Sequence, residues 1–206
     1  MTMVKMCGLR TVGDISYVNE AGPDMAGMIM VPGFRRTVTE DGARAMLSHL
    51  SASIRSVGVF MDQPEEDVIN ISSRLGFDVI QLHGGEDDGY VRRVRDALEV
   101  PVIKRFGASA DQLAAAEGSS ADMVLIDPGS GSGETFDLSV LGGLGRKVII
   151  AGGLTPDNVA DAIRKVRPYG VDTSSGIETG GSKDRDKMIR FISAVKAEDN
   201  QREETI

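Results

Sequence analysis

The sequence predicts a single-domain α/β protein, a (β/α)8 barrel of the TIM type, and three observations lead to this fold class. Short apolar segments alternate with amphipathic charged segments, a pattern typical of parallel strands joined by crossover helices. Eight apolar segments fit into 206 residues, near the lower size limit of this barrel. These segments are apolar throughout, as expected for strands that are covered on both faces.

The alternative is a doubly wound open sheet, which has fewer strands and a glycine-rich turn after the first. Here the glycine-rich turns follow the sixth, seventh and eighth strands, which favours the barrel. We place the barrel at residues 1–196, and we expect the acidic segment 197–206 to be a frayed, solvated end. The predicted strands are Met3–Cys7, Met25–Val31, Arg55–Met61, Phe77–Gly84, Val100–Gly107, Ala121–Gly129, Lys147–Gly153 and Tyr169–Gly176.

Helix signals separate most of these strands. After the third strand, acidic residues follow Pro64, Arg74 lies in the last turn, and Gly76 is the expected stop. After the seventh strand, Thr155 is the expected N-cap, with Pro156 in the first turn. The last helix has one apolar face at helical spacing, formed by Met188, Ile189, Phe191, Ile192 and Val195.

Composition restricts the class of function. The formal net charge of −8 argues against nucleic acid or an anionic membrane as the main partner, although backbone dipoles can still bind a small anion. One cysteine gives no internal disulfide, and we find neither a bilayer-spanning apolar run nor a signal pattern, so we expect a cytoplasmic protein. The single cysteine and two histidines show no metal-ligand spacing.

Glycines and serines follow the seventh and eighth predicted strands, where barrels of this kind bind phosphate. Gly152 and Gly153 have no side chains, so their N–H groups can approach an anion closely. Ser174 and Ser175 offer hydroxyls, and Gly176 offers a backbone N–H where a short helix can begin. Such glycines also serve tight turns, but two adjacent loops at these positions favour a phosphate site.

The loop after the sixth strand is also rich in glycine, with the sequence PGSGSGETFD at residues 128–137. We expect this loop to fold over a bound ligand as a mobile lid.

Three titratable residues lie where predicted strands end and would face the same rim of the barrel: Cys7, His83 and Asp127. A carboxyl and a thiol on opposite sides of a small sugar can move a proton between carbons without a cofactor. Lys5 shares a strand face with Cys7, and its ammonium would favour the thiolate, so we hypothesise that it helps to activate Cys7. By the same period, Gln81 lies beneath His83.

Each of these residues also has a structural interpretation. A lone cysteine is most often a small buried apolar residue. A lone histidine such as His83 more often positions a ligand than catalyses, and Asp127 can simply cap the loop that follows it. His49 lies inside a helix pattern and is interpreted as structural or surface-exposed.

Seven stretches occur in order over nearly the whole chain: VKMCGL, GPDMAGMIM, SVGVF, DVIQLHGGE, LIDPGSGSGETFD, IIAGGLTPDNV and GVDTSSGIETGGSKD. As an ordered set they resemble the phosphoribosylanthranilate isomerases, the small barrel enzymes of tryptophan biosynthesis. The resemblance implies an Amadori rearrangement of N-(5-phosphoribosyl)anthranilate to 1-(o-carboxyphenylamino)-1-deoxyribulose 5-phosphate, with no cofactor. It also implies that Cys7 is the general base and Asp127 the general acid.

The family's substrate-binding arginine matches Arg36 in GFRRTV, where its guanidinium would hold the anthranilate carboxylate. Phe34 and Arg35 stand where the family usually has serine and proline, so either arginine is a candidate. We expect Arg36, because it keeps the family's spacing to the residues that follow. Asp172 matches a family aspartate near the amino group of the substrate.

Two other functions compete with this one. The histidine-pathway isomerase performs the same chemistry on an aminoimidazole carboxamide ribotide, but it has an aspartate in place of Cys7 and a second phosphate site. A non-catalytic phosphoribosyl-binding barrel is disfavoured by the presence of both Cys7 and Asp127. The expected partner is a small phosphosugar, and the sequence is compatible with a monomer or a homodimer.

Overall fold

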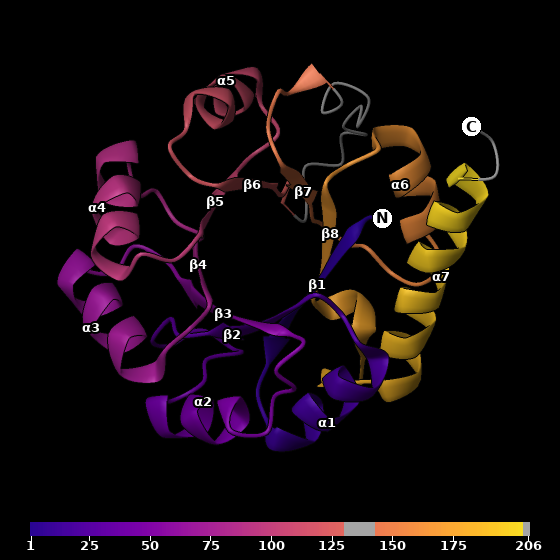
Figure 1. Ribbon diagram of the computed structural model, residues 1–206, viewed down its shortest axis with the longest axis horizontal. Coiled ribbons are helices and arrows are strands. Elements are labelled where there is room, and N and C mark those ends of the chain that lie inside the picture. Colours follow the sequence, from indigo (N-terminus) through magenta and orange to yellow (C-terminus); the bar gives the residue numbers. More distant parts are fainter. Residues whose placement is uncertain (130–142, 204–206) are drawn as a thin grey trace.

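The computed structural model describes residues 1–129 and 143–203, and within them eight parallel strands close into a barrel. Neighbouring strands pair in chain order, and β8 pairs with β1 to close the ring (Figure 1). The predicted (β/α)8 barrel is confirmed, and the open sheet is excluded. The barrel strands are β1 Met3–Leu9, β2 Met25–Ile29, β3 Arg55–Phe60, β4 Val79–Leu82, β5 Val102–Phe106, β6 Met123–Ile126, β7 Val148–Ile150 and β8 Gly170–Thr173.

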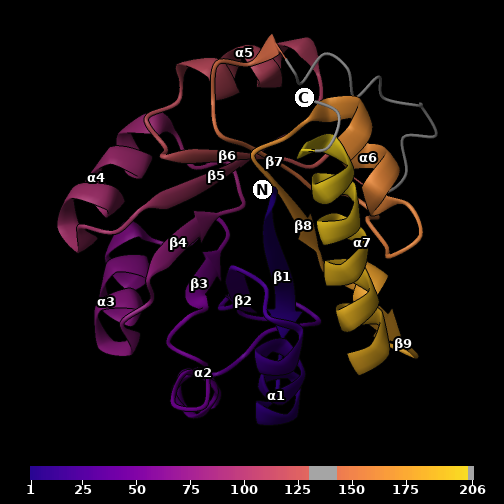
Figure 2. The same cartoon turned by 45° about the vertical axis from the view of Figure 1, so that its right-hand side comes forward.

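Helices cover the outside of the barrel, and α7 packs against both α1 and α6 (Figure 2). A 3-10 helix, η2 (Ser175–Ile177), and a two-stranded ribbon, β9 (Glu178–Thr179) with β10 (Ser182–Lys183), lie between β8 and α7. No helix in the described part of the chain is both long and apolar enough to cross a membrane. The α-helices are α1 Val12–Ala21, α2 Glu40–Leu47, α3 Glu65–Leu75, α4 Asp88–Leu98, α5 Ala110–Gly118, α6 Val159–Val166 and α7 Arg185–Glu203.

Strand side chains alternate between two apolar cores. One core fills the barrel and includes Cys7, Val59 and Ile149, while the other lies between strands and helices and includes Met6 and Phe60. Alternation follows from the two-residue period of a strand. Every second residue of β1 therefore points into the barrel, and Cys7 is one of these inward residues near the carboxyl end of the strand.

The sequence predicted that the first strand ends at Cys7. This is wrong, because β1 continues to Leu9. The pairing of β1 with β2 shifts register near this end, and Gly8 has a φ of 71°. A Cβ at Gly8 would lie 2.7 Å from Arg36 Cδ and 2.8 Å from Ser174 Oγ. The irregular end of β1 thus needs glycine, which lets two predicted site residues pack against the strand.

The predicted helix after the third strand is confirmed, since α3 ends at Gly76 in the left-handed conformation. The expected start of the helix after the seventh strand is wrong. Helix α6 begins only at Val159, because a turn precedes it in which the Thr155 N–H donates to Asn158 Oδ1 at 2.8 Å. Thr155 therefore lies in that turn and is not the N-cap.

The acidic end of the chain is part of the barrel domain as far as Glu203. The Thr2 hydroxyl donates to Asp199 at 2.7 Å, and Arg164 Nη2 donates to Glu198 Oε2 at 2.6 Å. Both of these carboxylates are buried. The expectation of a frayed end is wrong for residues 197–203, because two acidic side chains anchor the last turns of α7 to the barrel.

Candidate active site

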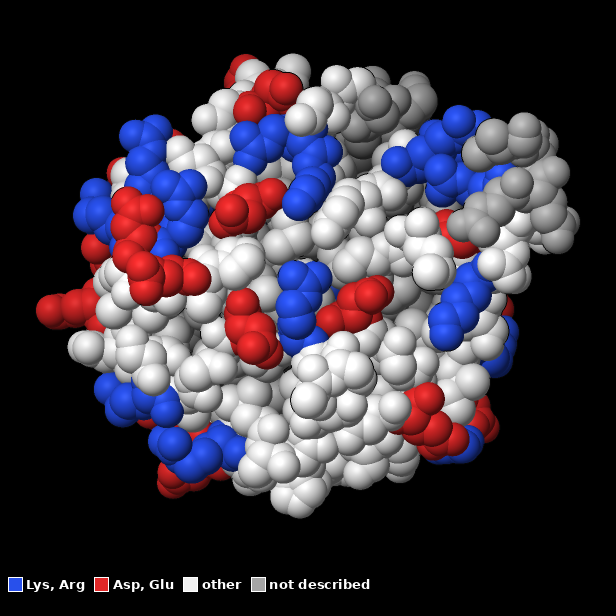
Figure 3. Space-filling model, viewed as in Figure 1, with Lys and Arg blue, Asp and Glu red and all other residues white. Residues whose placement is uncertain are grey.

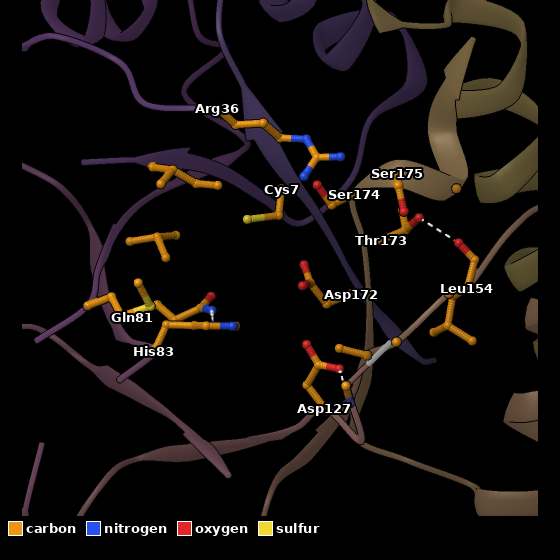
Figure 4. Close-up of a pocket in the computed structure, with 18 of the residues that line it drawn as sticks. Cys7, Arg36, Gln81, His83, Asp127, Leu154, Asp172, Thr173, Ser174 and Ser175 are labelled. Atoms are coloured by element: carbon orange, nitrogen blue, oxygen red, sulfur yellow. Dashed lines mark hydrogen bonds between the residues drawn. The ribbon is translucent and has the colours of Figure 1, made fainter. Parts of the chain in front are cut away.

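A cavity of about 590 Å³ lies at the carboxyl ends of the barrel strands. Figure 4 shows side chains from several strands pointing into it, with Asp172 between Cys7 and Asp127. All but one of the predicted site residues line this cavity, and the exception, Lys5, lies buried within the barrel. The lining residues among them are Cys7, Arg36, His83, Asp127, Gly152, Gly153, Asp172, Ser174, Ser175 and Gly176.

Lys5 and Asp172 form a buried ion pair next to Cys7. They are register partners across β1 and β8, and Lys5 Nζ donates to Asp172 Oδ1 at 3.0 Å. Burial disfavours the Lys5 ammonium, but Asp172 and Cys7 together outweigh this effect and raise the pKa of Lys5 above its ordinary value. Lys5 therefore carries its charge at neutral pH.

Gly27 makes room for this arrangement on the neighbouring strand β2. A Cβ at Gly27 would lie 2.9 Å from Cys7 Sγ and 3.2 Å from Lys5 Nζ. Both atoms thus approach the same point of the β2 backbone, which a larger residue would occupy. The lysine and the thiol are close neighbours, as the two-residue spacing in the sequence suggested.

Asp127 follows β6 directly, at the edge of the cavity. The backbone N–H of Asp127 donates to the Phe106 carbonyl at 3.0 Å, and the Arg105 guanidinium donates to the Asp127 carbonyl at 3.0 Å. Its side-chain Oδ1 accepts the Gly129 N–H at 3.0 Å. The carboxylate therefore caps the start of the next loop while it also lines the cavity.

His83 follows β4, and its Nδ1 lies 2.9 Å from Gln81 Nε2. The Gln81 amide and the His83 ring are therefore paired, with the direction of the hydrogen bond set by the tautomer of the ring. Burial lowers the pKa of His83, and the nearby Asp127 carboxylate only partly offsets this effect. His83 thus lines the cavity as a ring whose burial favours the neutral form, and Gln81 lies against it as the strand period predicted.

Arg36 is the arginine that lines the cavity, while the side chain of Arg35 is 66% exposed. Arg36 Nε and Nη2 donate to the two carboxylate oxygens of Glu178 at 2.8 and 3.0 Å. Burial disfavours the Glu178 carboxylate, but hydrogen bonds and charge from Arg36 and Lys183 prevail and lower its pKa to about 2. This ion pair holds the guanidinium in a fixed orientation.

The loops after β7 and β8 meet at the predicted phosphate site. Gly152 and Gly153 both have positive φ, 97° and 66°, which non-glycine residues rarely adopt. Ser174 Oγ is buried and has no hydrogen-bond partner within the described residues. Successive glycine N–H groups and an unpaired buried hydroxyl form a polar surface that suits an anion.

The two loops pack closely against each other at the Leu154 carbonyl. Thr173 Oγ1 donates to the Leu154 carbonyl at 2.8 Å, and a Cβ at Gly176 would lie 1.8 Å from the same oxygen. Gly176 lies in the predicted short helix, η2. Most of the predicted lid, residues 130–137, lies outside the described residues.

Sequence reasoning missed Glu178 and Lys183, which lie on the β9–β10 ribbon beside Arg36. Both occur in the stretch GIETGGSKD, which carries family resemblance but has no strand or helix periodicity. Phe34, which departs from the family pattern, is an exposed aromatic residue that lines the cavity.

Comparisons with known proteins indicate the family to which this chain belongs. The family model for N-(5'phosphoribosyl)anthranilate (PRA) isomerase matches residues 4–194. The N-(5'-phosphoribosyl)anthranilate isomerase of Desulforudis audaxviator is 41% identical, with 95% of this chain and 98% of the relative covered. That of Endomicrobium trichonymphae is 37% identical, with 96% and 100% covered.

Solved structures of the same enzyme also superimpose closely. Phosphoribosyl anthranilate isomerase from Thermotoga maritima has a TM-score of 0.87 at 32% identity, with 96% of this chain and 100% of that chain covered. A complex of such an isomerase with reduced 1-(o-carboxyphenylamino)-1-deoxyribulose 5-phosphate has a TM-score of 0.85 at 32% identity, with the same coverage. On this evidence the chain belongs to the N-(5'-phosphoribosyl)anthranilate isomerase family.

Proposed function

We propose that this chain isomerises N-(5'-phosphoribosyl)anthranilate to 1-(o-carboxyphenylamino)-1-deoxyribulose 5-phosphate in tryptophan biosynthesis, with Cys7 as general base and Asp127 as general acid. One observation carries the assignment of these roles. Cys7 on β1 and Asp127 after β6 stand on either side of the β7 and β8 loops in a single cavity. A sugar whose phosphate binds those loops would lie between a thiol and a carboxyl.

The cavity also accounts for the two ends of the substrate. The phosphate would bind N–H and hydroxyl groups after β7 and β8, at Gly153 and Ser174. Apolar Ile29 and Val59 line the cavity from β2 and β3, across the ring from β6 and β7, and would contact the aryl ring. Arg36 would bind the anthranilate carboxylate through a charge-assisted pair.

The reaction then proceeds through a proton donation by Asp127, a proton abstraction by Cys7 and a final tautomerisation. Asp127 donates a proton to the furanose ring oxygen as its bond to C1 breaks, and the nitrogen lone pair forms the C=N bond of an iminium ion. The Cys7 thiolate removes the proton from C2, and the released electron pair forms a C1=C2 bond while the C=N pair returns to nitrogen. The resulting enolamine moves its 2-hydroxyl proton to C1 and becomes the ketone. Proton exchange with water restores Cys7 and Asp127.

The buried charge next to Cys7 supports its role as a base. A Cβ at Gly27 would contact both Cys7 Sγ and Lys5 Nζ, so the ammonium lies close to the thiol, as our hypothesis that Lys5 helps to activate Cys7 requires. Asp172 balances Lys5 and would also accept the N–H of the anthranilate amino group, since it lines the cavity between Cys7 and Asp127 (Figure 4).

Within the described residues, a substrate with two phosphates would find no comparable site in the opposite half of the barrel. After β3 and β4, the N–H groups of Gly84 and Gly85 are already bonded to the carboxylates of Glu86 and Asp62, at 2.9 and 2.6 Å. Two carboxylates at these N–H groups, against the single cation Lys104 that pairs with Glu86 at 2.9 Å, leave a net negative charge that would disfavour a second phosphate. This supports the single-phosphate substrate over the histidine-pathway one.

The expected setting of the enzyme follows from the same features. The site is built from one chain, so either a monomer or a homodimer would be active; a relative from Thermotoga maritima is described as dimeric. Figure 3 shows acidic and basic side chains interspersed over one face, an arrangement that suits a small-molecule enzyme better than a nucleic-acid binder. The cytoplasmic setting is the expectation drawn from the composition of the chain.

The test is the loss of anthranilate-type fluorescence when the protein is given freshly made phosphoribosylanthranilate. We expect rapid loss with the native chain and a fall in kcat/KM of about 10³-fold or more for Cys7→Ala and Asp127→Asn. Asp157→Asn, at an aspartate whose side chain is 77% exposed, is the matched control and keeps native activity. Fluorescence loss by the native chain no faster than the spontaneous rate would refute the proposal.

A further inference from the structure

The β9–β10 ribbon brings a buried carboxylate and a buried ammonium to the edge of the cavity. Glu178 and Lys183 are register partners in this ribbon, and their side chains are 6% and 0% exposed. Lys183 Nζ donates to Glu178 Oε1 at 3.1 Å, and the same oxygen accepts from Arg36 Nε at 2.8 Å. Burial of two cations around one carboxylate is costly unless each charge has a defined partner.

Arg36 uses one edge of its guanidinium for Glu178. Nε and one N–H of Nη2 donate to the two carboxylate oxygens, at 2.8 and 3.0 Å. The five N–H donors of arginine form two forks, so the Nη1–Nη2 edge is left for a second carboxylate. Arg36 lines the cavity beside Cys7 and Ser174 (Figure 4).

Lys183 connects this pair to the phosphate loop. Besides Glu178, its ammonium donates to the Ser174 carbonyl at 2.8 Å. In a trans peptide the carbonyl and the next N–H point in opposite directions, so this bond turns the Ser175 N–H away from Lys183. Lys183 therefore fixes the orientation of a peptide whose flanking residues both line the cavity.

We propose that Glu178 is a positioning residue that orients Arg36 for the substrate carboxylate, and that Lys183 joins this pair to the phosphate loop. Three cations pair with this one carboxylate, the buried Lys183, Arg36 and the largely exposed Arg35, and they leave the cluster positive, which suits an anionic aryl group. The inference rests on the proposed function, because it takes Arg36 as the ligand of the anthranilate carboxylate. It adds that Lys183, through its contacts with Glu178 and the Ser174 carbonyl, links the group that would bind the substrate carboxylate to the loop that would bind the phosphate.

The experiment is a double-mutant cycle on KM for phosphoribosylanthranilate, with Glu178→Gln, Arg36→Met and both together. We expect Glu178→Gln to raise KM about 10- to 100-fold while kcat changes less than about threefold. In the Arg36→Met background, Glu178→Gln should change KM less than about twofold, because its effect acts through the arginine. KM does not depend on the fraction of protein that folds, so partial misfolding does not confuse this readout.

Inorganic phosphate as a competitive inhibitor separates the two roles. Glu178→Gln should leave the inhibition constant of phosphate unchanged, whereas Lys183→Met should raise both that constant and KM, and Lys183→Arg should restore part of each. Glu40→Gln is the matched control, since Glu40 makes the same two-bond pair with Arg74 on the surface, at 3.0 and 2.7 Å.

A native KM in Glu178→Gln, or an equal effect of that change with and without Arg36, would overturn the inference while the proposed function stands. An unchanged phosphate constant in Lys183→Met would overturn the link to the phosphate loop. Absence of turnover by the native chain would instead overturn the proposed function, and the inference with it.

Discussion

Replacement of Gly176 by alanine tests whether the closely packed loops after β7 and β8 carry the phosphate site. A Cβ at this position would lie 1.8 Å from the Leu154 carbonyl oxygen and 2.8 Å from its carbon. That oxygen cannot easily turn aside, because it accepts the Thr173 hydroxyl at 2.8 Å. The substitution must therefore move one loop backbone away from the other.

The size of the displacement sets the expected loss. Ordinary contact starts at 3.4 Å, so the two backbones must separate by about 1.6 Å. A misplacement of about 1 Å between binding groups and reacting groups can cost about 100-fold in rate. We expect kcat/KM of Gly176→Ala to fall by about 100-fold or more, equivalent to about 2.7 kcal/mol of transition-state stabilisation.

The assay measures initial rates by anthranilate fluorescence, and inhibition by inorganic phosphate, in Gly176→Ala beside Gly118→Ala. Gly118 ends α5, and a Cβ there would meet nothing within 4 Å, so the control should keep native rates. Circular dichroism checks that both variants fold. A kcat/KM and a phosphate constant within about threefold of native in Gly176→Ala would refute the assignment of this loop contact to phosphate binding.

Two further predictions concern buried polar groups. Lys5→Met removes the cation beside Cys7, so the midpoint of the iodoacetamide alkylation profile should move to higher pH; an unchanged profile would contradict the activation hypothesis. Asp199→Ala removes the partner of Thr2, so the free energy of unfolding in urea should fall by about 1–3 kcal/mol, and an unchanged midpoint would show that the end of α7 is not anchored there.

The sequence predicted the barrel, and the side of β1 on which Cys7 lies, because strand and helix periods are local properties of the chain. It could not predict the irregular end of β1 at Gly8, where Arg36 and Ser174 pack against the strand from distant segments. The prediction of a frayed acidic end was wrong for a related reason. Two of its acidic side chains have partners at Thr2 and Arg164, and no local pattern shows such contacts.

The missed carboxylate, Glu178, shows the same limit inside the site. A glutamate in a glycine-rich stretch is typical of a solvated turn, yet the side chain of Glu178 is only 6% exposed. Its burial follows from Arg36 and Lys183, which arrive from a loop after β2 and from β10. Cys7, His83 and Asp127 lie near or just after strand ends and can be located from the strand pattern, whereas Arg36 was located by family resemblance and Glu178 depends on tertiary contacts.

The ion pair of Lys5 and Asp172 is better explained by chemistry than by stability. Replacement of a buried ion pair by well-packed apolar residues is often neutral or stabilising, so stability alone gives no reason for charges inside an apolar barrel core. Around the pair the core is largely apolar, with Val57 and Ile103 buried and Gln81 as a buried neutral polar side chain. A fixed ammonium beside Cys7 would supply the thiolate for abstraction of a proton from carbon, and Asp172 would hold it there while facing the substrate nitrogen. The pair thus puts the charge required by the proposed reaction at the one wall of the barrel that carries the thiol.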